Sequence, residues 1–471
     1  MRKMQKRKIA KTMVKVLLCI SILTPVLSGC TKKEETANLD NVVISIGSWP
    51  ADNKIEELKS YDNMVSIMAE TYPNIKIVPD KWVYDVKTFL PKASSNQLPT
   101  MYKTYFTEIN KIIDSNYAAD VTEYMKKYGY TEAMNADLLD MVTKDGKIYG
   151  IPLDGYAQGL AANKTLFKQA GLVNADGTVQ FPDTYEELAE TAKIIKEKTG
   201  KAGFGIATMK NQGGWHFMNI AWSYGTQFMA EENGKWNAKF DSPECIAALQ
   251  YVKDLKWKYD VLPDNAFVDK NELNKLFATD QLAMCFAVPP VNELIRDYEM
   301  EREVLSVGRM LSGPKGRFSQ MGGNVIMLAP NATAEQIDAV FKWLEISGIT
   351  PKVNDVTMAK WENDNKKFNA EGIIVLDQTP FKIWTNGERM DAETEIKRKY
   401  VNINPADFKD YYEFKDVTIK SEEPMCCQEL YNTFDACIQA VITDKDADVA
   451  AIVKKAASDF QTNYLDKINE E

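Results

Sequence analysis

The chain carries a single histidine, His216, in 471 residues, and this scarcity excludes several kinds of catalytic site. Zinc sites built from several histidines and H-E-x-x-H helices each need two or more. A Ser-His-Asp or Cys-His arrangement could use only this one residue. We therefore expect no metal site and no cofactor, while catalysis by carboxylates, lysines or tyrosines is not excluded.

Cysteine is also scarce, and no C-x-x-C pair occurs among the seven cysteines. Two of them, Cys19 and Cys30, lie near the N-terminus. The other five are Cys245, Cys285, Cys426, Cys427 and Cys437. Because five is odd, at least one must be free or paired between molecules. The adjacent Cys426 and Cys427 could form a strained vicinal disulfide, but we expect two unpaired thiols and no disulfide framework.

Motifs for phosphate and calcium are missing as well. The glycines at 313–316 lack the spacing of a P-loop. Residues 444–448 open like a calcium loop, but Val449 replaces the glycine at position six and Lys455 replaces the glutamate at position twelve. We interpret this stretch as a solvated turn followed by a helix start.

Charge is distributed unevenly along the chain. The formal net charge is −10, but residues 1–29 hold seven basic residues and no acid, which leaves 50 basic against 67 acidic residues in the remainder. A body at −17 repels phosphate backbones, so we expect no nucleic-acid partner. The whole chain has 45% hydrophobic and 26% charged residues, which is the composition of a soluble globular protein.

The first thirty residues have the features of an export signal. A basic stretch precedes a mostly apolar run at 13–23, which is too short to span a bilayer comfortably. Leu27-Ser28-Gly29-Cys30 then resembles the lipobox of bacterial lipoproteins, in which cleavage precedes a diacylglycerol-bearing cysteine. We therefore predict a lipoprotein signal peptide at 1–29 and a lipidated Cys30 with a flexible tether at 30–41. An ordinary secreted protein, or an uncleaved anchor, is the alternative.

Strand and helix patterns alternate in the body. Residues 42–49 predict a buried strand, 55–71 a helix and 74–78 a second strand, which is typical of an α/β fold with a parallel sheet. The inward positions expected for the helix are Leu58, Met64, Val65 and Met68.

Later segments carry clear start and turn signals. Asp145-Gly146-Lys147 predicts a turn, Thr184 to Glu187 has capping-box spacing for a helix that ends near Lys198, and Asn233-Gly234 predicts a hairpin. A stripe at helical spacing predicts a final helix over 449–460. A length of 471 residues requires at least two domains or lobes, yet no Gly/Pro/Ser-rich linker and no internal repeat divides the chain.

The order of several motifs resembles the extracellular solute-binding proteins of bacterial ABC importers, of the carbohydrate-binding family 1 type. The segments that carry the resemblance are 44–49, 96–100, 145–152, 162–172, 181–188, 277–284 and 435–465. Thr100 and Asp280 depart from the family pattern, which has Asp and Gly there. The resemblance implies a two-lobed periplasmic-binding-protein fold of type II, each lobe a mostly parallel sheet flanked by helices. It places lobe 1 at 42–153 plus about 322–350 and lobe 2 at 154–321 plus about 351–471.

A sugar site needs aromatic platforms for apolar ring faces and fixed polar groups for hydroxyls. The chain has nine tryptophans and 21 tyrosines, and most tryptophans, including Trp257 and Trp343, are expected in the core. The candidate ligand-binding residues after strands or in loops are Trp49, Asp154, Tyr156, Gln212, Trp215 and Asn324. The resemblance adds Tyr105 and Tyr431, at positions where it implies cleft aromatics. Trp222, one or two turns after Trp215, is a candidate whose alternative is core packing. Trp215, in a predicted loop at 211–216, is the first choice for a stacking platform. His216 is expected to be a hydrogen-bonded structural group.

These features predict a membrane-anchored, monomeric protein that captures an oligosaccharide by hinge closure and delivers it to an ABC permease on the extracytoplasmic face of the cell membrane. A surface glycosidase with two carboxylates is one alternative. The same fold could instead bind a peptide, polyamine or metal, or present its ligand to a sensor kinase.

Overall fold

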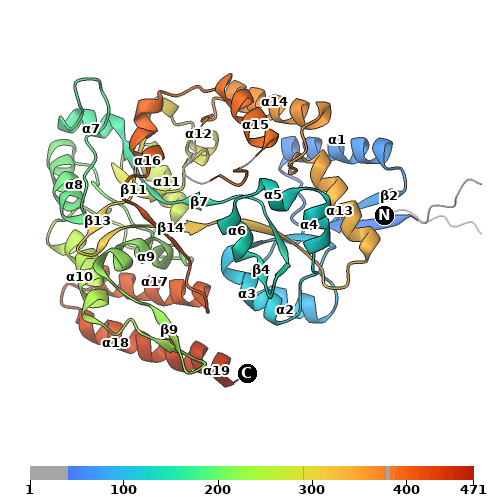
Figure 1. Ribbon diagram of the computed structural model, residues 1–471. Coiled ribbons are helices and arrows are strands. Elements are labelled where there is room, and N and C mark those ends of the chain that lie inside the picture. Colours follow the sequence, from blue (N-terminus) through green and yellow to red (C-terminus); the bar gives the residue numbers. More distant parts are fainter. Residues whose placement is uncertain (1–40, 290, 378–381, 386, 471) are drawn as a thin grey trace, which may run out of the picture. The chain divides into compact units, whose positions relative to one another are not determined.

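The computed structural model describes residues 41–289, 291–377, 382–385 and 387–470 (Figure 1). The predicted signal peptide, Cys30 and the tether up to residue 40 lie outside the described residues. The first sheet has five strands in the order β2-β1-β3-β15-β6. Their bounds are β1 Val42–Ile46, β2 Ile75–Pro79, β3 Met101–Tyr105, β6 Gly150–Pro152 and β15 Asn324–Leu328.

The expectation of a mostly parallel sheet is confirmed here, because β2, β1, β3 and β6 run in the same direction and only β15 is reversed. Strand β1 is parallel to β2 and β3, but β15 is antiparallel to both β3 and β6. The reason is the direction from which β15 enters. Its first residue, Asn324, pairs with Tyr105, the last residue of β3, so β15 starts at the edge where β3 ends.

Helices around the first sheet enclose one hydrophobic core. Their bounds are α1 Ile55–Thr71, α2 Val86–Ser94, α3 Ile109–Asp114, α4 Thr122–Lys127, α5 Tyr130–Ala133, α6 Ala136–Met141 and α13 Ala334–Ile346. Trp49 and Trp343 stack in this core with ring centroids 6.2 Å apart. A small hairpin, β4 Thr143–Lys144 and β5 Lys147–Ile148, contains the predicted Asp145-Gly146 turn.

The second part of the chain is built on smaller sheets. Strand β8 lies between β11 and β12 and is antiparallel to both, while β14 pairs with β7, β13 and β16. The bounds are β7 Tyr156–Ala157, β8 Gly159–Asn163, β9 Met229–Glu232, β10 Lys235–Ala238, β11 Met284–Ala287, β12 Leu305–Gly308, β13 Ser312–Gly313, β14 Gly316–Gly322 and β16 Thr418–Ser421. The expectation of a mostly parallel sheet is therefore wrong for this part.

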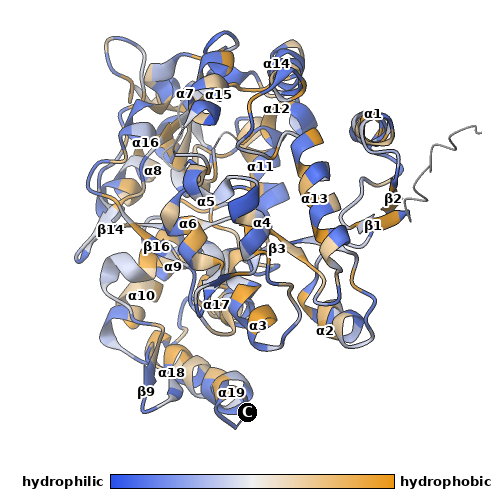
Figure 2. Ribbon diagram, turned by 45° about the vertical axis from the view of Figure 1, so that its right-hand side comes forward, coloured by the Kyte–Doolittle hydropathy of each residue, from blue (hydrophilic) through white to orange (hydrophobic). Residues whose placement is uncertain are grey.

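Two further cores fill this region. One contains Phe217, Phe240, Phe434 and Phe460 among many others, and the other includes Phe408. The helices are α7 Lys164–Ala170, α8 Tyr185–Thr199, α9 Gln212–Tyr224, α10 Pro243–Trp257, α11 Lys270–Ala278, α12 Glu293–Tyr298, α14 Asp355–Ala370, α15 Glu388–Arg398, α16 Lys409–Glu413, α17 Cys427–Thr443, α18 Val449–Phe460 and α19 Asp466–Glu470. Figure 2 shows hydrophobic residues concentrated on α18.

Most local predictions are confirmed. Helix α1 spans the predicted 55–71, with Met64 and Met68 buried and Leu58 and Val65 packed against the core. The hairpin at Asn233-Gly234 and the final helix α18 are also present. The capping box of α8 forms only in part. Thr184 accepts a hydrogen bond from the Glu187 amide, but the Glu187 carboxylate accepts from the Asp183 amide, one residue earlier than the motif requires.

Two core predictions have different outcomes. Trp343 is 2% exposed, as expected, whereas Trp257 is 37% exposed, so its assignment to the core is wrong. Trp257 is the last residue of α10, and its indole Nε1 donates to the Val441 carbonyl at 2.9 Å. This bond holds the ring at the surface.

The prediction of unpaired thiols is confirmed for four cysteines. Cys245, Cys285, Cys427 and Cys437 are free and buried. Because Cys427 is free, the vicinal disulfide with Cys426 is not formed. Burial raises the pKa of the Cys285 and Cys437 thiols to about 12, which keeps both protonated.

The lobe boundaries stay a prediction. The segment between α14 and α15 contacts the core of the first sheet as well as a core of the second part. Trp384, which follows α14 in the region assigned to lobe 2, packs in the first core with its ring 5.6 Å from that of Tyr130. Between Trp361 and Trp384 lies the Arg389 guanidinium, 3.9 and 4.8 Å from the two ring centroids. Ile374 in the same segment belongs to one of the cores of the second part.

Candidate functional site

Two neighbouring connections run between the first sheet and the second part of the chain, and predicted site residues lie on both. One leads from β6 to β7 through Asp154, and the other leads from β14 to β15 through Gly323. The Asn324 backbone amide donates to Asp154 Oδ1 at 2.9 Å, and Asn324 Nδ2 donates to Asp154 Oδ2 at 2.8 Å. Tyr105 pairs with Asn324 in the sheet, so three predicted residues meet here.

Glycines let these connections approach each other closely. A Cβ on Gly322 would lie 2.4 Å from the Tyr156 hydroxyl oxygen, and one on Gly323 would lie 2.3 Å from the Asp154 carbonyl oxygen. Both distances are shorter than any real contact of a Cβ atom. Glycine is therefore required at 322 and 323 by the packing between the two connections.

Trp215 lies in the first turn of α9, and the prediction of a loop at 211–216 is wrong. The Asp435 carboxylate of α17 accepts hydrogen bonds from the amides of Asn211 at 2.6 Å and Gly214 at 2.9 Å. These are donors that a helix start leaves unpaired. Gly214 also has no room for a side chain, because its Cβ would lie 2.2 Å from the Tyr431 carbonyl oxygen.

Aromatic rings gather beside the connections, in a group we call the aromatic cluster: Tyr84, Tyr105, Tyr156 and Trp215. The Tyr156 and Trp215 ring centroids are 6.1 Å apart and those of Tyr84 and Tyr105 are 5.8 Å apart, both edge to face. Tyr105 is 42% exposed, and Tyr156 and Trp215 are partly exposed. Partly exposed rings with polar neighbours can contact the apolar face of a ligand while adjacent groups bind its polar atoms.

A chain of buried side-chain hydrogen bonds runs from Asn219 of α9 to the Glu422 carboxyl group. Asn219 Nδ2 donates to Gln158 Oε1 at 3.1 Å, and Gln158 Nε2 donates to Gln320 Oε1 at 3.0 Å. Gln320 Nε2 then donates to the Tyr431 hydroxyl, which donates to Glu422 Oε1 at 2.8 Å. The chain therefore ties α9, β14 and α17 to Gln158, the residue between β7 and β8.

Two carboxyl groups near the aromatic cluster have altered acidity. Burial, with a smaller contribution from the charge of Glu108, raises the pKa of Glu422 to about 8, although the Tyr431 hydroxyl opposes the shift. Burial also raises the pKa of Glu108, and the charge of Glu429 adds to it. The Tyr84 hydroxyl donates to Glu108 Oε2 at 2.7 Å.

Several predicted site residues lie in the interior instead. Trp49 is 6% exposed, Trp222 2% and Tyr431 1%. The Trp222 indole Nε1 donates to Glu423 Oε1 at 3.1 Å, and Gln212 Oε1 accepts from the Lys270 amide at 2.6 Å. Their ligand contacts stay predictions, while their present contacts are structural.

His216 is 2% exposed, and its Nδ1 has no hydrogen-bond partner. The expectation of a hydrogen-bonded structural histidine is therefore wrong for this atom. Burial, with a small contribution from Lys270, lowers the pKa of the imidazole to about 3, so the ring is neutral at physiological pH. Its ring lies 5.1 Å from that of Trp215.

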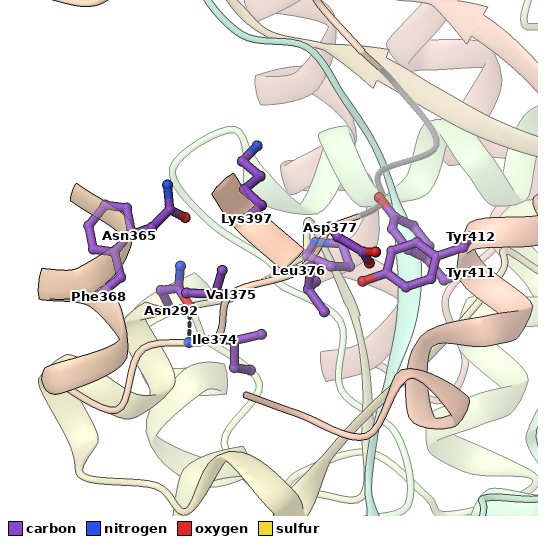
Figure 3. A pocket seen from close by; sticks show the side chains of 11 residues that line it. Asn292, Asn365, Phe368, Ile374, Val375, Leu376, Asp377, Lys397, Tyr411 and Tyr412 are labelled. Atoms are coloured by element: carbon purple, nitrogen blue, oxygen red, sulfur yellow. Dashed lines mark hydrogen bonds between the residues drawn. The ribbon is translucent and has the colours of Figure 1, made fainter. Parts of the chain in front are cut away.

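Two cavities lie near the α14–α15 segment, and none of the rings of the aromatic cluster lines either of them. One of about 210 Å³ contains none of the predicted residues, and Figure 3 shows the rings of Tyr411 and Tyr412 beside Asp377 on one side of it. The other, of about 360 Å³, is lined by Asp154 and by Trp384 and residues of α15. Neither cavity joins the predicted residues into one binding pocket.

Sequence reasoning missed Tyr84, Glu108, Gln320 and Glu422. Tyr84 lies shortly after the end of β2, and Tyr105 is the last residue of β3. Because site residues often lie at strand ends, this position could have marked Tyr84 as a candidate. The sequence around Glu422 contains no motif that predicts its altered acidity. Its hydrogen bond comes from Tyr431, and part of its raised pKa comes from Glu108, which is far away in the sequence.

None of the helices in the described part of the chain is long and apolar enough to cross a bilayer. Within the same residues, no group of three or more His, Cys, Asp or Glu side chains is arranged to hold a metal ion.

The fold is that of the two-domain periplasmic binding proteins. Maltose-bound MalE3 of T. maritima superposes with a TM-score of 0.66 at 18% identity, over 90% of this chain and 100% of that one. The model of the bacterial extracellular solute-binding protein family matches residues 59–346, and the chain belongs to this family.

Relatives of known sequence agree with this assignment. A binding protein of Brucella abortus is 25% identical over 203 residues, which is 42% of this chain and 47% of that protein, so the match spans about half the relative's length. The polygalacturonan/rhamnogalacturonan-binding protein of Bacillus subtilis is 25% identical over 361 residues, covering 68% of this chain and 67% of that protein.

Proposed function

We propose that this protein captures a carbohydrate, specifically an oligosaccharide, and delivers it to an ABC permease without changing it chemically. The observation that carries the proposal is the aromatic cluster, with partly exposed Tyr105, Tyr156 and Trp215, beside the two connections of a solute-binding fold. The carbohydrates named for the Bacillus subtilis and T. maritima relatives support this ligand class.

The mechanism proposed is hinge closure around the connections. A ligand bound to Tyr105 on one side and to Trp215 on the other gains contacts only when the two parts approach. It therefore shifts the open–closed equilibrium by the difference in its affinity for the two states. The closed form is then the state that the permease accepts.

The test is a glycan array followed by thermal unfolding and small-angle scattering of the purified chain. We expect a bound glycan to raise the melting temperature and reduce the radius of gyration. If no glycan in the array binds or shifts the melting temperature, the proposal is wrong. Release of shortened products from a bound glycan would instead favour the glycosidase alternative.

We also propose that Cys30 anchors the protein to the extracytoplasmic face of the cell membrane as a lipoprotein. The support is the order of basic stretch, apolar run and L-S-G-C in the sequence. Two acyl chains hold a soluble protein firmly at a membrane, whereas one is marginal. Cys30→Ser should abolish labelling by a fatty-acid analogue and move the protein out of the membrane fraction, and unchanged labelling would contradict the anchor.

A further inference from the structure

Helix α9, which carries Trp215, begins without a cap from its own segment. Its N-cap residue is Asn211, whose side chain makes no capping hydrogen bond and instead donates to Gln428 Oε1 of α17 at 3.2 Å. Lys210 and Asn211 both have positive φ, 61° and 67°. Successive non-glycine residues in the left-handed region are strained and persist only where the surrounding structure imposes them. The entry into α9 is therefore set by its neighbours in space.

The missing cap is supplied by Asp435 of α17, which lies 224 positions from Asn211 in the chain. Asp435 Oδ2 accepts from the Asn211 amide at 2.6 Å, and Oδ1 accepts from the Gly214 amide at 2.9 Å. Asp435 is 4% exposed, so water has little access to replace either bond. The helix dipole favours a negative charge at this end. Because each oxygen binds a different amide, one carboxylate fixes the first turn of α9 at two points.

Glycines bring α9 directly against α17 at the same place. A Cβ on Gly213 would lie 2.6 Å from Asp435 Oδ1, and one on Gly214 would lie 2.2 Å from the Tyr431 carbonyl oxygen. The second contact is between two backbones. The first turn of α9 therefore has no free space in which to move toward α17.

Trp215 follows this anchored turn immediately. Its amide donates to the Asn211 carbonyl at 3.1 Å, and its ring lies edge to face with Tyr156 of β7, with centroids 6.1 Å apart. One turn further along α9, Asn219 Oδ1 accepts from the Gln320 amide of β14 at 2.7 Å. Helix α9 is thus held by α17 at its start and by β14 one turn later, and these two anchors place the Trp215 ring relative to both connections.

Building on the proposed function, we infer that Asp435 is a positioning residue for glycan binding: it holds the first turn of α9, and with it the Trp215 ring, in the orientation that contacts the ligand. A ring that is fixed before the glycan arrives binds more tightly, because ordering a mobile side chain on binding costs affinity. Without the carboxylate, two buried amides lose their partners and the strained entry into α9 relaxes. The ring then samples other orientations, and the affinity falls although Asp435 itself does not touch the glycan.

The experiment is a double-mutant cycle, read by titration calorimetry with the tightest-binding oligosaccharide of the glycan array. Asp435→Asn keeps the shape of the side chain, but its single oxygen can accept from only one of the two amides. In the wild-type background we expect this change to weaken binding by about tenfold or more. In the Trp215→Ala background it should weaken binding by less than about twofold, because the ring on which Asp435 acts is absent. An equal loss in both backgrounds would overturn the positioning role.

Asp448→Ala is the matched control for the loss of a helix cap. Asp448 caps α18 by accepting from the Ala451 amide at 3.0 Å, and α18 carries no member of the aromatic cluster. This variant should lower the melting temperature, as the loss of a cap does, and leave the glycan affinity unchanged. If it weakens binding as much as Asp435→Asn does, cap loss acts through general stability and the inference is wrong.

If Asp435→Asn does not fold, amide hydrogen exchange of the wild-type protein provides the test. Because coupling between two sites is reciprocal, the bound oligosaccharide should slow exchange of the Asn211 and Gly214 amides by about fivefold or more, and that of the Ala451 amide by less than about twofold. Equal exchange of Asn211 and Gly214 with and without the oligosaccharide would overturn the coupling.

The outcomes also separate this inference from the proposed function. Wild-type protein that binds a glycan, together with normal affinity in Asp435→Asn, would overturn the positioning role alone and leave carbohydrate capture supported. Failure of every glycan to bind the wild-type protein would overturn both proposals.

Discussion

The aromatic residues of this protein fall into two groups that the amino-acid type does not distinguish. In the first core, Trp49 lies 6% exposed against Trp343 and Tyr61, with ring centroids 6.2 and 4.7 Å away. In the aromatic cluster, Tyr105 is 42% exposed and Trp215 is partly exposed. The difference shows that burial of a ring on all sides makes it structural, whereas one open side beside polar groups makes it available to a ligand.

The largest effect is expected for a tryptophan of the interior. Trp222→Ala removes a 2% exposed ring and leaves the Glu423 carboxyl without its indole donor. The free energy of unfolding should fall by about 3–5 kcal/mol, the usual range for a buried tryptophan, as measured by urea denaturation. A loss below about 1 kcal/mol would contradict the structural assignment.

His216 lies where the aromatic cluster meets the interior, and it predicts a pH effect. Its pKa in the folded protein is lowered to about 3, below the ordinary histidine value of about 6.5, so the unfolded chain binds the proton first as the pH falls. Stability is therefore lost between about pH 6.5 and 3, by roughly 3 kcal/mol at pH 4. His216→Gln should lose less stability over this range, and parallel denaturation curves for the two proteins would contradict the prediction.

Trp215→Ala should separate binding from stability. Because the ring is partly exposed and contacts Tyr156 edge to face, its removal should weaken glycan affinity by about 10- to 100-fold, or about 1–3 kcal/mol. The melting temperature should change less than in Trp222→Ala. A variant with normal affinity would show that Trp215 is not a ligand contact.

The smallest effect is expected at Trp257, which serves as the matched control. Its ring is 37% exposed and contributes one hydrogen bond to the Val441 carbonyl. Trp257→Ala should lower the free energy of unfolding by only about 1 kcal/mol and leave glycan affinity unchanged. A change in affinity here would mean that tryptophan removal acts through general destabilisation.

Helices and turns were predictable where the residues of one short segment were sufficient to specify them. The helix at 55–71, the turn at Asn233-Gly234 and the final helix at 449–460 were all confirmed, because periodicity and turn residues act over a few positions. The start of α9 was missed, since its N-terminus is satisfied by Asp435 from another helix rather than by a neighbouring cap.

Sheet pairing and the membership of the aromatic cluster needed the whole fold. Nothing in the sequence of β15 shows that it pairs antiparallel with β3, because the direction follows from where the preceding strand ends. Likewise, Tyr105 and Tyr431 were both predicted as ligand contacts, yet one is 42% exposed and the other 1%.

The sequence by itself determined the family, the order of most elements, and the excess of aromatic and acidic residues in the body. Only the tertiary structure decided which rings stay open and which carboxyl groups a tyrosine hydroxyl binds. Gln320 and Tyr431, for example, are hydrogen-bonded although 111 positions separate them in the chain. Propensities and motifs report on neighbours in sequence, whereas burial and electrostatic interaction depend on neighbours in space.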